Sequence, residues 1–400
     1  MRTAVVLAFG TYIASVVVVL SVVAYGQKCI PSWPEHPSSR RGGIVDSMCA
    51  WDGEWYANIA TSGYASGQTK PEAIAFFPAY PIFGRAVMLA TKLSAEASLL
   101  VVSHAFWLGS LVALAVYLRG RDSPMSHSLI LYTLLAMAFF PSTFYFRMAY
   151  TESMFLFLMI VALYGMRKSW PALAIALVIG LATATRSVGV ALLVPFVLHL
   201  WKTSGRGLRR PFPHALVFIP VACWGLAAFM GYQIWAFKDP FAFAEAQRAW
   251  HVRAAPASII DRAADLLTLE PIISVYSPTS PCYWRNTAPH DSPVVNLAFA
   301  NPVFFLGTAI LVIIGAYRGW LDRSEWLLSG LLLLIPYIMQ SNRMGMVSQA
   351  RFASVVFPAY IVIGQFLARV PTALAVTLIF GSAILMGAYT ALFTSWYFFF

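Results

Sequence analysis

The segment from Trp51 to Tyr56, with the sequence WDGEWY, places two carboxylates among aromatic side chains soon after the first long apolar run. A carboxylate held at a bilayer surface is costly, so such a residue more often belongs to a site than to a scaffold. On a helix at about 100° per residue, Asp52 borders the face that carries Trp51 and Trp55, whereas Glu54 projects to nearly the opposite side. Asp52 is therefore the first candidate for proton transfer, and the competing interpretation is a helix N-cap.

Further ionisable and amide side chains lie near the ends of later apolar runs, where such residues mark a substrate path or a site. With Glu54 and Tyr56, these candidates are Arg147, Glu152, Arg186, Arg343, Gln349 and Arg351. Plainer interpretations remain open for four of them. Glu54 could be a solvated side chain and not a second carboxylate of the site. Glu152 could pair with Arg147 across a turn. Arg186 could reach the lipid headgroups, and Arg351 could cap a helix at the interface.

The composition defines the class of protein. Of 400 residues, 60% are hydrophobic and only 11% are charged, and the mean hydropathy is +0.71. This balance is typical of a multi-pass membrane protein and excludes a soluble globular domain. The net charge of +11 comes mostly from short loops between apolar runs, so it predicts topology and not nucleic-acid binding.

Apolar runs recur along the whole chain and predict an all-α bundle of about ten to twelve transmembrane helices in a single domain. The runs lie near residues 4–25, 97–118, 128–146, 150–166, 171–201, 213–236, 299–317, 325–340, 351–368 and 372–393. The run 171–201 is interrupted by Arg186 and Gly189 and is predicted to form two short helices. The run 76–93 carries Arg85 and two prolines, so we expect it to be re-entrant or interfacial.

Basic clusters predict the sidedness of these helices. The clusters are Arg119/Arg121, Arg167/Lys168, Lys202 to Arg210, and Arg318/Arg323, and the positive-inside rule places them in the cytoplasm. The polar candidates then gather on the outward side, with a first outward loop at 26–75 and a long one at 237–298. Charges near one surface favour an enzyme over the alternative, a transporter or flippase with repeated halves and midplane charges.

The long loop at 237–298 is rich in proline, and only 241–252 and 257–268 are predicted to be helices, which we expect to lie in the interface. Within it, Gln247 and Trp250 are candidate substrate contacts, or alternatively an aromatic anchor at the membrane surface.

The cysteines and carboxylates do not predict a metal site. Cys29, Cys49, Cys223 and Cys282 lack metal-binding spacing, although a disulfide among the three in outward loops is possible. Asp52 and Glu54 point apart on a helix and could not readily share one ion. We therefore expect no obligatory metal, although a divalent cation is conceivable.

Several short motifs follow one another in a definite order along the chain. They are WDG…Y, GY and FFPAYP within 51–81, FP…YTES within 140–153, ATRSVG at 184–189, PFAF…AQ…W within 240–250, and RF…FP within 351–358. Together they resemble the PIG-V family, GPI mannosyltransferase II, and its bacterial relatives. Each motif alone would be weak, and their order makes the resemblance more specific.

The resemblance implies a GT-C-like fold and a glycosyltransferase that uses a polyprenyl-phosphate sugar donor on the face opposite the cytoplasm. It further implies an inverting reaction that relies on an acidic residue of the first outward loop, a position that Asp52 fits. The sugar would be mannose or another hexose, and the acceptor a glycan, a lipid or a protein. The chain is shorter than the eukaryotic members and has no N-x-S/T sequon, which favours a bacterial inner membrane over the endoplasmic reticulum.

The chemistry assigns roles to these candidates. An inverting transfer needs one base for the acceptor hydroxyl, for which Asp52 is predicted. The departing phosphate gains charge, which an arginine fork can stabilise, and Arg351 ranks before Arg343 and Arg186. The expected substrate-binding residues are Glu54, Tyr56, Arg147, Glu152, Arg186, Gln247, Trp250, Arg343, Gln349 and Arg351.

Overall fold

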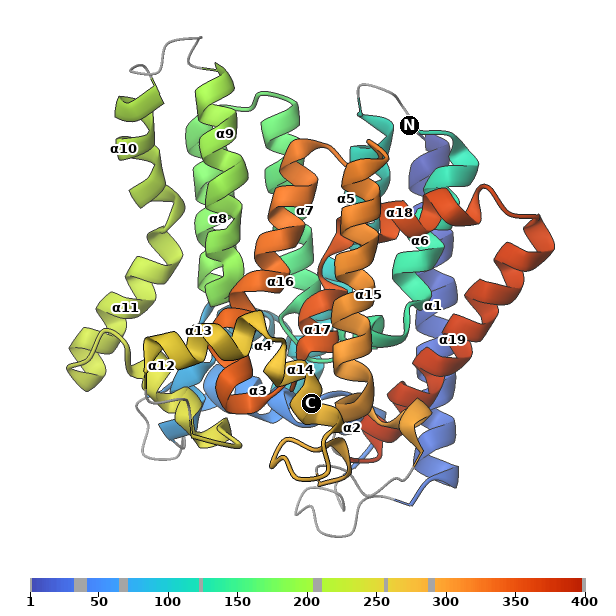
Figure 1. The fold of residues 1–400 in the computed structure, drawn as a ribbon, viewed down its shortest axis with the longest axis horizontal. Helices are drawn as coiled ribbons and strands as arrows, with labels where there is room; N and C mark the ends of the chain where they lie inside the picture. Colours follow the sequence, from blue (N-terminus) through green and yellow to red (C-terminus); the bar gives the residue numbers. More distant parts are fainter. Residues whose placement is uncertain are drawn as a thin grey trace.

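The computed structural model of the chain describes residues 2–31, 42–64, 71–121, 125–203, 211–254, 258–286 and 292–397. Within these ranges every regular element is a helix, which confirms the predicted all-α membrane fold (Figure 1). Helices satisfy their own backbone hydrogen bonds, as a chain in hydrocarbon requires.

The α-helices vary widely in length, from 5 to 28 residues. They are α1 (Arg2–Cys29), α2 (Ile44–Met48), α3 (Asp52–Ser62), α4 (Ala79–Thr91), α5 (Ala95–Arg119), α6 (His127–Phe139), α7 (Glu152–Arg167), α8 (Ala172–Thr185), α9 (Leu193–Thr203), α10 (Pro211–Ala222), α11 (Trp224–Phe237), α12 (Ala242–Ala246), α13 (Ile259–Leu267), α14 (Glu270–Tyr276), α15 (Leu297–Tyr317), α16 (Arg323–Met344), α17 (Gln349–Ser354), α18 (Phe357–Leu367) and α19 (Thr372–Thr394). The 3-10 segments are η2 (Pro71–Ala75), η3 (Pro141–Arg147), η4 (Ser187–Leu192), η5 (Gln247–Trp250), η6 (Trp284–Asn286) and η7 (Pro293–Val295).

Four helices of the described chain, α1, α5, α15 and α19, are each long and apolar enough to cross a membrane, and α6 with η3 would make a fifth span bent by 81°. Ten to twelve spans were predicted, and fewer helices meet this criterion in part because other apolar runs form shorter helices, such as α8 with 14 residues and α18 with 11. The break between α6 and η3 falls at Phe140, which is extended, because proline at 141 disfavours a helical residue ahead of it. A second break separates α17 from α18 at Val355 and Val356.

The predicted interruption of the run 171–201 is confirmed. α8 ends at Thr185, Arg186 adopts an extended backbone with φ −154°, and η4 starts at Ser187. Gly189 lies against the end of α8, where an added Cβ would come within 2.7 Å of the carbonyl oxygen of Ala182. The chain therefore folds back on itself here, and this turn delivers Arg186 to the interior.

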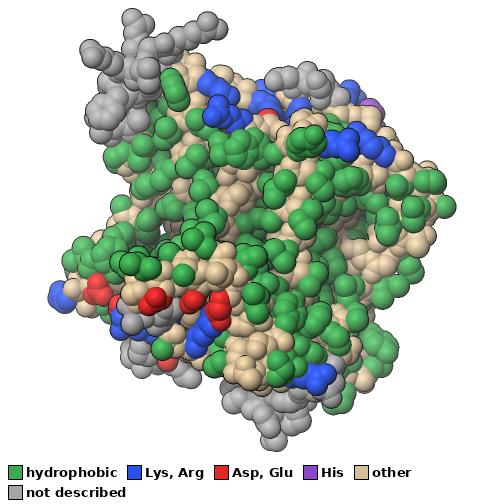
Figure 2. Space-filling model, viewed as in Figure 1, with side chains coloured by type: hydrophobic (Ala, Val, Ile, Leu, Met, Phe, Trp, Pro, Cys, Tyr) green, Lys and Arg blue, Asp and Glu red, His purple; other side chains and the backbone are tan. Residues whose placement is uncertain are grey.

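Basic side chains gather at one end of the bundle, which we call the basic end and which lies at the top of Figure 2. Here the buried carboxylate of Glu325 binds Arg121 at 2.5 Å and Arg167 at 3.5 Å, and Asp322 also pairs with Arg167. These contacts join the ends of α5 and α7 to the start of α16. The basic end is the one that the sequence predicts to be cytoplasmic.

The first loop and the long loop meet at the opposite end. The ring of Trp250 lies 6.3 Å from that of Trp55 and 5.8 Å from that of Phe76, and Phe77 contacts Phe243 at 5.5 Å. The two segments, remote in sequence, therefore lie on the same side of the bundle.

The predicted non-crossing segment forms α4, a helix of 13 residues that pairs with the start of α5. The Tyr80 hydroxyl donates to the carbonyl of Leu99 at 2.9 Å and contacts the Ser103 hydroxyl at 2.7 Å. At 1.5 Å per residue, α4 spans about 20 Å, less than the hydrocarbon layer.

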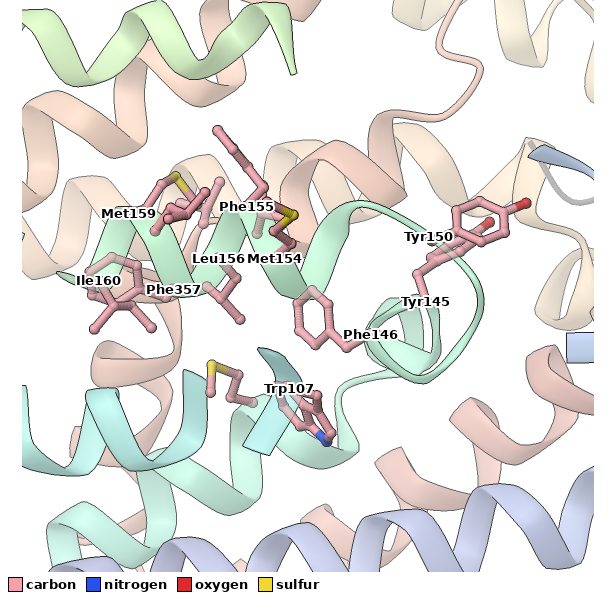
Figure 3. Packing of buried hydrophobic residues seen from close by; sticks show 14 of the residues in the cluster. Trp107, Tyr145, Phe146, Tyr150, Met154, Phe155, Leu156, Met159, Ile160 and Phe357 are labelled. Carbon is pink, nitrogen blue, oxygen red and sulfur yellow. The ribbon is translucent and has the colours of Figure 1, made fainter. Parts of the chain in front are cut away.

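The core of the bundle surrounds α7 and the segment that precedes it. Phe146 packs on Trp107 with ring centroids 4.9 Å apart, while Tyr145 and Tyr150 lie on the other side of the η3 turn (Figure 3). All three side chains are buried, and the Tyr150 hydroxyl reaches the first loop, where it donates to the carbonyl of Ala50 at 3.3 Å.

Candidate active site

Asp52 begins α3, and the backbone around it is closely fitted to the core. Trp51, just before it, has φ 60°, a value that a bulky residue adopts only when its surroundings enforce it. Its ring packs on that of Trp396, 5.7 Å away, beyond the end of α19. The amide of Asp52 donates to the Tyr150 hydroxyl at 3.1 Å, and Gly53 lies so close to the core that an added Cβ would be 3.1 Å from the sulfur of Cys49.

Two carboxylates and two guanidinium groups form a continuous ion-pair chain at this point. Arg351 binds Asp52 through Nη1 and Glu152 through Nε, and Arg186 binds the same oxygen of Glu152 through Nη1. The four side chains come from α3, α7, α17 and the turn after α8. Their formal charges balance, as a buried polar cluster requires.

Exposure is lowest inside this chain of charges and higher at its two ends. The side chain of Glu152 is fully buried, those of Arg351 and Arg186 are 7% and 12% exposed, and that of Asp52 is 15% exposed. Asp52 is therefore the more accessible of the two carboxylates, and a substrate could reach it. Glu152 lies between the two arginines, where it can only hold them.

Aromatic faces fix the planes of the two guanidinium groups. The Cζ atom of Arg351 lies 4.5 Å from the ring centroid of Tyr150 and 5.6 Å from that of Tyr145, and Arg186 lies 5.3 Å from that of Phe352. Cation–π contacts of this kind hold a guanidinium without using its hydrogen-bond donors. Tyr145, Tyr150 and Phe352 were not among the predicted site residues, although Tyr150 belongs to the YTES motif.

The alternatives drawn from the sequence can now be compared with the geometry. Asp52 gives its carboxylate to Arg351, and the N-cap position of α3 belongs to Trp51. Glu152 pairs with Arg186 and Arg351 and not with Arg147. Arg186 is turned inward to this pair, so it does not reach for the lipid headgroups.

Arg147 lies outside the cluster. Its side chain is fully buried, donates from Nη2 to the carbonyls of Ala138 at 3.2 Å and Thr143 at 3.1 Å, and lies 5.2 Å from the centre of the Trp107 ring. These contacts tie η3 to the end of α6 and suit a structural role.

Tyr56 and Glu54 lie on different sides of α3. Tyr56 is buried between Phe76 and Tyr80, with both ring centroids at 5.1 Å, and burial raises the pKa of its hydroxyl, which stays neutral. Glu54 is half-buried and forms no ion pair with any described residue. The sequence predicted that Asp52 and Glu54 point apart on a helix, and this arrangement is consistent with that prediction.

The remaining candidates lie around the cluster at the same end. Trp250 packs on Trp55, and Gln247 precedes it in η5, half-buried. The backbone carbonyl of Arg343 accepts from the amides of Val252 and Arg253, both at 3.0 Å, which ties the long loop to the end of α16. Gln349 is buried, and neither of its amide atoms has a hydrogen-bond partner among the described residues.

The cysteines and carboxylates of the described chain form no metal-binding group. No set of three His, Cys, Asp or Glu residues in the described ranges could hold an ion, and all four cysteines are free. The disulfide considered among Cys29, Cys49 and Cys282 is thus not formed.

The chain was compared with known proteins by sequence and by structure, and solved structures that resemble it include two of an archaeal oligosaccharyltransferase. No family model and no curated protein matches the chain by sequence. The archaeal oligosaccharyltransferase AglB from Archaeoglobus fulgidus, in complex with an inhibitory peptide and a dolichol-phosphate, is similar with a TM-score of 0.47 and 14% identity over 96% of this chain and 56% of its own. The A. fulgidus oligosaccharyltransferase in complex with Zn and sulfate is similar with a TM-score of 0.42 and 14% identity, over 94% and 53%.

The chain thus spans about half the length of the structures it resembles. At this identity the comparison assigns no residue a role, and the roles of Asp52, Glu152, Arg186 and Arg351 rest on the geometry of this chain. The resemblance to the PIG-V family stays a prediction.

Proposed function

We propose that this membrane protein is an inverting glycosyltransferase that moves a sugar from a polyprenyl-phosphate carrier to an acceptor hydroxyl on the extracytoplasmic face. The observation that carries the proposal is the ion-pair chain of Asp52, Arg351, Glu152 and Arg186, which ends in the one partly exposed carboxylate of the four side chains. A base beside fixed guanidinium groups suits a reaction that takes a proton at one atom and releases a phosphate at another.

The reaction is a single displacement. The acceptor oxygen attacks the anomeric carbon and its proton passes to Asp52, while the bond from that carbon to the phosphate oxygen breaks. The phosphate leaves with the electron pair, and its growing charge is stabilised by Arg351 and Arg186. Because attack and departure occur on opposite sides of one carbon, the product is inverted.

Arg351 links the two halves of this mechanism. In the structure it occupies Oδ2 of Asp52 with one nitrogen and Glu152 with another. A donor phosphate would offer Arg351 a stronger anionic partner, so donor binding would free Asp52 for the acceptor hydroxyl. Glu152 would keep its hold on Nε, and the guanidinium would stay in place during the exchange.

A groove beside the site suits the carrier. A cavity of about 530 Å³ lies between α3, α4, α8 and α11, and its lining is almost entirely apolar. Its wall includes Ile59 on α3 and Ala184, two residues before Arg186. An isoprenoid chain in this groove would bring its phosphate toward the arginine pair.

The finer assignments follow the resemblance stated above. We propose mannose or another hexose as the sugar, the bacterial inner membrane as the location, and a glycan, lipid or protein as the acceptor. We also propose that no divalent metal is required, because each carboxylate of the cluster already has an arginine partner.

A transfer assay tests the proposal. Purified protein in detergent would receive a panel of radiolabelled polyprenyl-phosphate sugars with a membrane lipid extract as the acceptor. We expect transfer from one donor, with the anomeric configuration of the product inverted relative to that donor. Retention would contradict the single displacement, and carrier movement across vesicles without any transfer would favour a flippase.

A further inference from the structure

The helix α13, in the long loop, exposes a complete apolar face. The exposed fractions of Ile259, Ile260 and Leu267 are 83%, 79% and 84%. Ile260 and Leu267 are seven residues apart, so they lie on one face of the helix, with Ile259 and Ala263 beside them. No described residue covers this face, which is unusual for large aliphatic side chains in water.

The other two faces of α13 have different partners. One face docks on α16: the Tyr337 hydroxyl donates to the carbonyl of Leu266 at 3.0 Å, and the Asn342 side chain donates to the carbonyl of Arg262 at 3.2 Å. The other face carries Asp261 and Asp265. The side chain of Ser258 caps the helix by accepting from the amide of Asp261 at 2.9 Å, so α13 is a formed element with a defined start.

The position of α13 in the fold places its apolar face beside the membrane surface of the bundle. Tyr337 and Asn342 belong to the last turns of α16, so α13 lies at the level where that helix leaves the bundle. In those turns Ile338 and Met339 are also exposed, at 44% and 71%. In the part of the molecule where Figure 1 shows α12 and α13, Figure 2 shows acidic side chains in a row beneath a hydrophobic band.

We propose that α13 lies in the interfacial layer of the outer leaflet, with Ile259, Ile260 and Leu267 among the acyl chains and Asp261 and Asp265 toward water. The apolar surface of α13 continues that of α16, so the bilayer that surrounds α16 also covers the apolar face of α13. Interfacial helices often have basic polar faces that attract anionic lipids. Because the polar face of α13 is acidic, its membrane contact depends on the apolar face, and zwitterionic lipid suffices for it.

This contact also links the bilayer to the site. After α13, Glu270 binds Arg253 through two hydrogen bonds of 2.7 and 2.5 Å, and three residues before Arg253 is Trp250, whose ring contacts Trp55. Trp55 is on the helix that begins at Asp52. A helix seated in the membrane is thus tied to the segment that packs on α3, the helix that carries Asp52, whatever reaction the site performs.

Spin labels can test the membrane contact. Ile260→Cys and Leu267→Cys would be made in a background where Cys29 and Cys223 are serine, with the buried Cys49 and Cys282 retained. The matched control is Asp261→Cys, exposed on the same helix. Each labelled full-length protein would be placed in phosphatidylcholine nanodiscs, and its collision rates with oxygen and with the water-soluble reagent NiEDDA would be measured.

We expect labels at 260 and 267 to favour oxygen over NiEDDA by several-fold relative to the label at 261. Equal access of NiEDDA to all three positions would place the apolar face in water and overturn the proposal. Exclusion of both reagents from 260 and 267 would mean that protein covers the face, as in a contact between two copies of the chain, and would overturn it as well.

Discussion

At the scale of single residues, the site depends on how the hydrogen-bond donors of Arg351 are shared between Asp52 and Glu152. One nitrogen holds Asp52 and another holds Glu152, and the face of Tyr150 fixes the guanidinium plane. Asp52 can accept a hydroxyl proton at Oδ2 only when Arg351 turns to another anion. Glu152 is fully buried and binds both arginines, so it positions them without touching a substrate.

Replacing Glu152 with glutamine should therefore damage both the fold and the reaction. Two buried arginines would lose their shared anion, which should lower the free energy of unfolding by about 3 kcal/mol. Turnover should fall by about a hundredfold, because the cations for the phosphate lose their fixed geometry. Thermal unfolding in detergent and the transfer assay measure the two effects, and normal values of both would contradict this role.

Removal of divalent metal should leave the activity unchanged. Each carboxylate of the cluster already binds arginine, and an ion would have to displace that partner. The measurement is the rate of transfer before and after treatment with EDTA. A loss of activity that manganese or magnesium restores would show that the cluster rearranges around a metal.

At the scale of elements, the site depends on how closely the helices approach one another. α8 and α11 cross at Gly180 and Gly225, where an added Cβ on Gly225 would lie 2.1 Å from the carbonyl oxygen of Gly180. Small residues let membrane helices pack this closely. α8 leads directly into Arg186, so this crossing helps to place one of the two arginines.

The variant Gly225→Ala should separate these helices and lower the stability by about 1–3 kcal/mol. The matched control on the same helix is Gly231→Ala, where no atom lies within 4 Å of the added Cβ. The control should be neutral or slightly stabilising, since alanine favours a helix over glycine by about 1 kcal/mol. Thermal unfolding of both variants measures the difference, and equal effects would mean that the crossing is not tightly packed.

The sequence predicted the breaks that a charged residue causes but not those between apolar residues. Arg186 and Gly189 within an apolar run indicated the end of α8, and the structure has it at Thr185. The break at Val355 and Val356 was not predicted, because β-branched apolar residues continue the hydrophobic pattern. In the structure α17 nevertheless ends at Ser354 and α18 starts at Phe357.

The same limit applies to the site. Asp52, Glu152, Arg186 and Arg351 could be selected because charge is rare in apolar surroundings. Which of them pair with one another could not be predicted, because Arg351 lies 299 residues from Asp52 and 199 from Glu152 along the chain. Arg147, the arginine nearest to Glu152 in the sequence, instead donates to backbone carbonyls.

At the scale of the whole molecule, the two ends differ in charge and in chemistry. The basic end is held by Glu325 with Arg121 and Arg167, and the opposite end carries Asp52 and the two loops that meet at Trp250. This polarity agrees with a cytoplasmic basic end and an outward site, and it makes the sidedness testable.

Labelling in right-side-out membrane vesicles should separate the two ends. A membrane-impermeant maleimide should react with Cys29, which is exposed at the end of α1, and with a Lys92→Cys variant at the end of α4. A Lys168→Cys variant, at the basic end and with Cys29 replaced by serine, should react only after the vesicles are opened. Labelling of Lys168→Cys in sealed vesicles would reverse the topology, and protection of Lys92→Cys would mean that α4 crosses the membrane.

The measurement that tests the central claim most directly compares Asp52→Asn with Glu54→Gln in the transfer assay. Both variants remove one carboxylate from α3, but only Asp52 belongs to the ion-pair chain. We predict that Asp52→Asn loses at least a hundredfold in turnover while it elutes and unfolds as a folded protein, and that Glu54→Gln stays within a few-fold of the wild type. Equal activity of a folded Asp52→Asn protein and the wild type would contradict the assignment of Asp52 as the base.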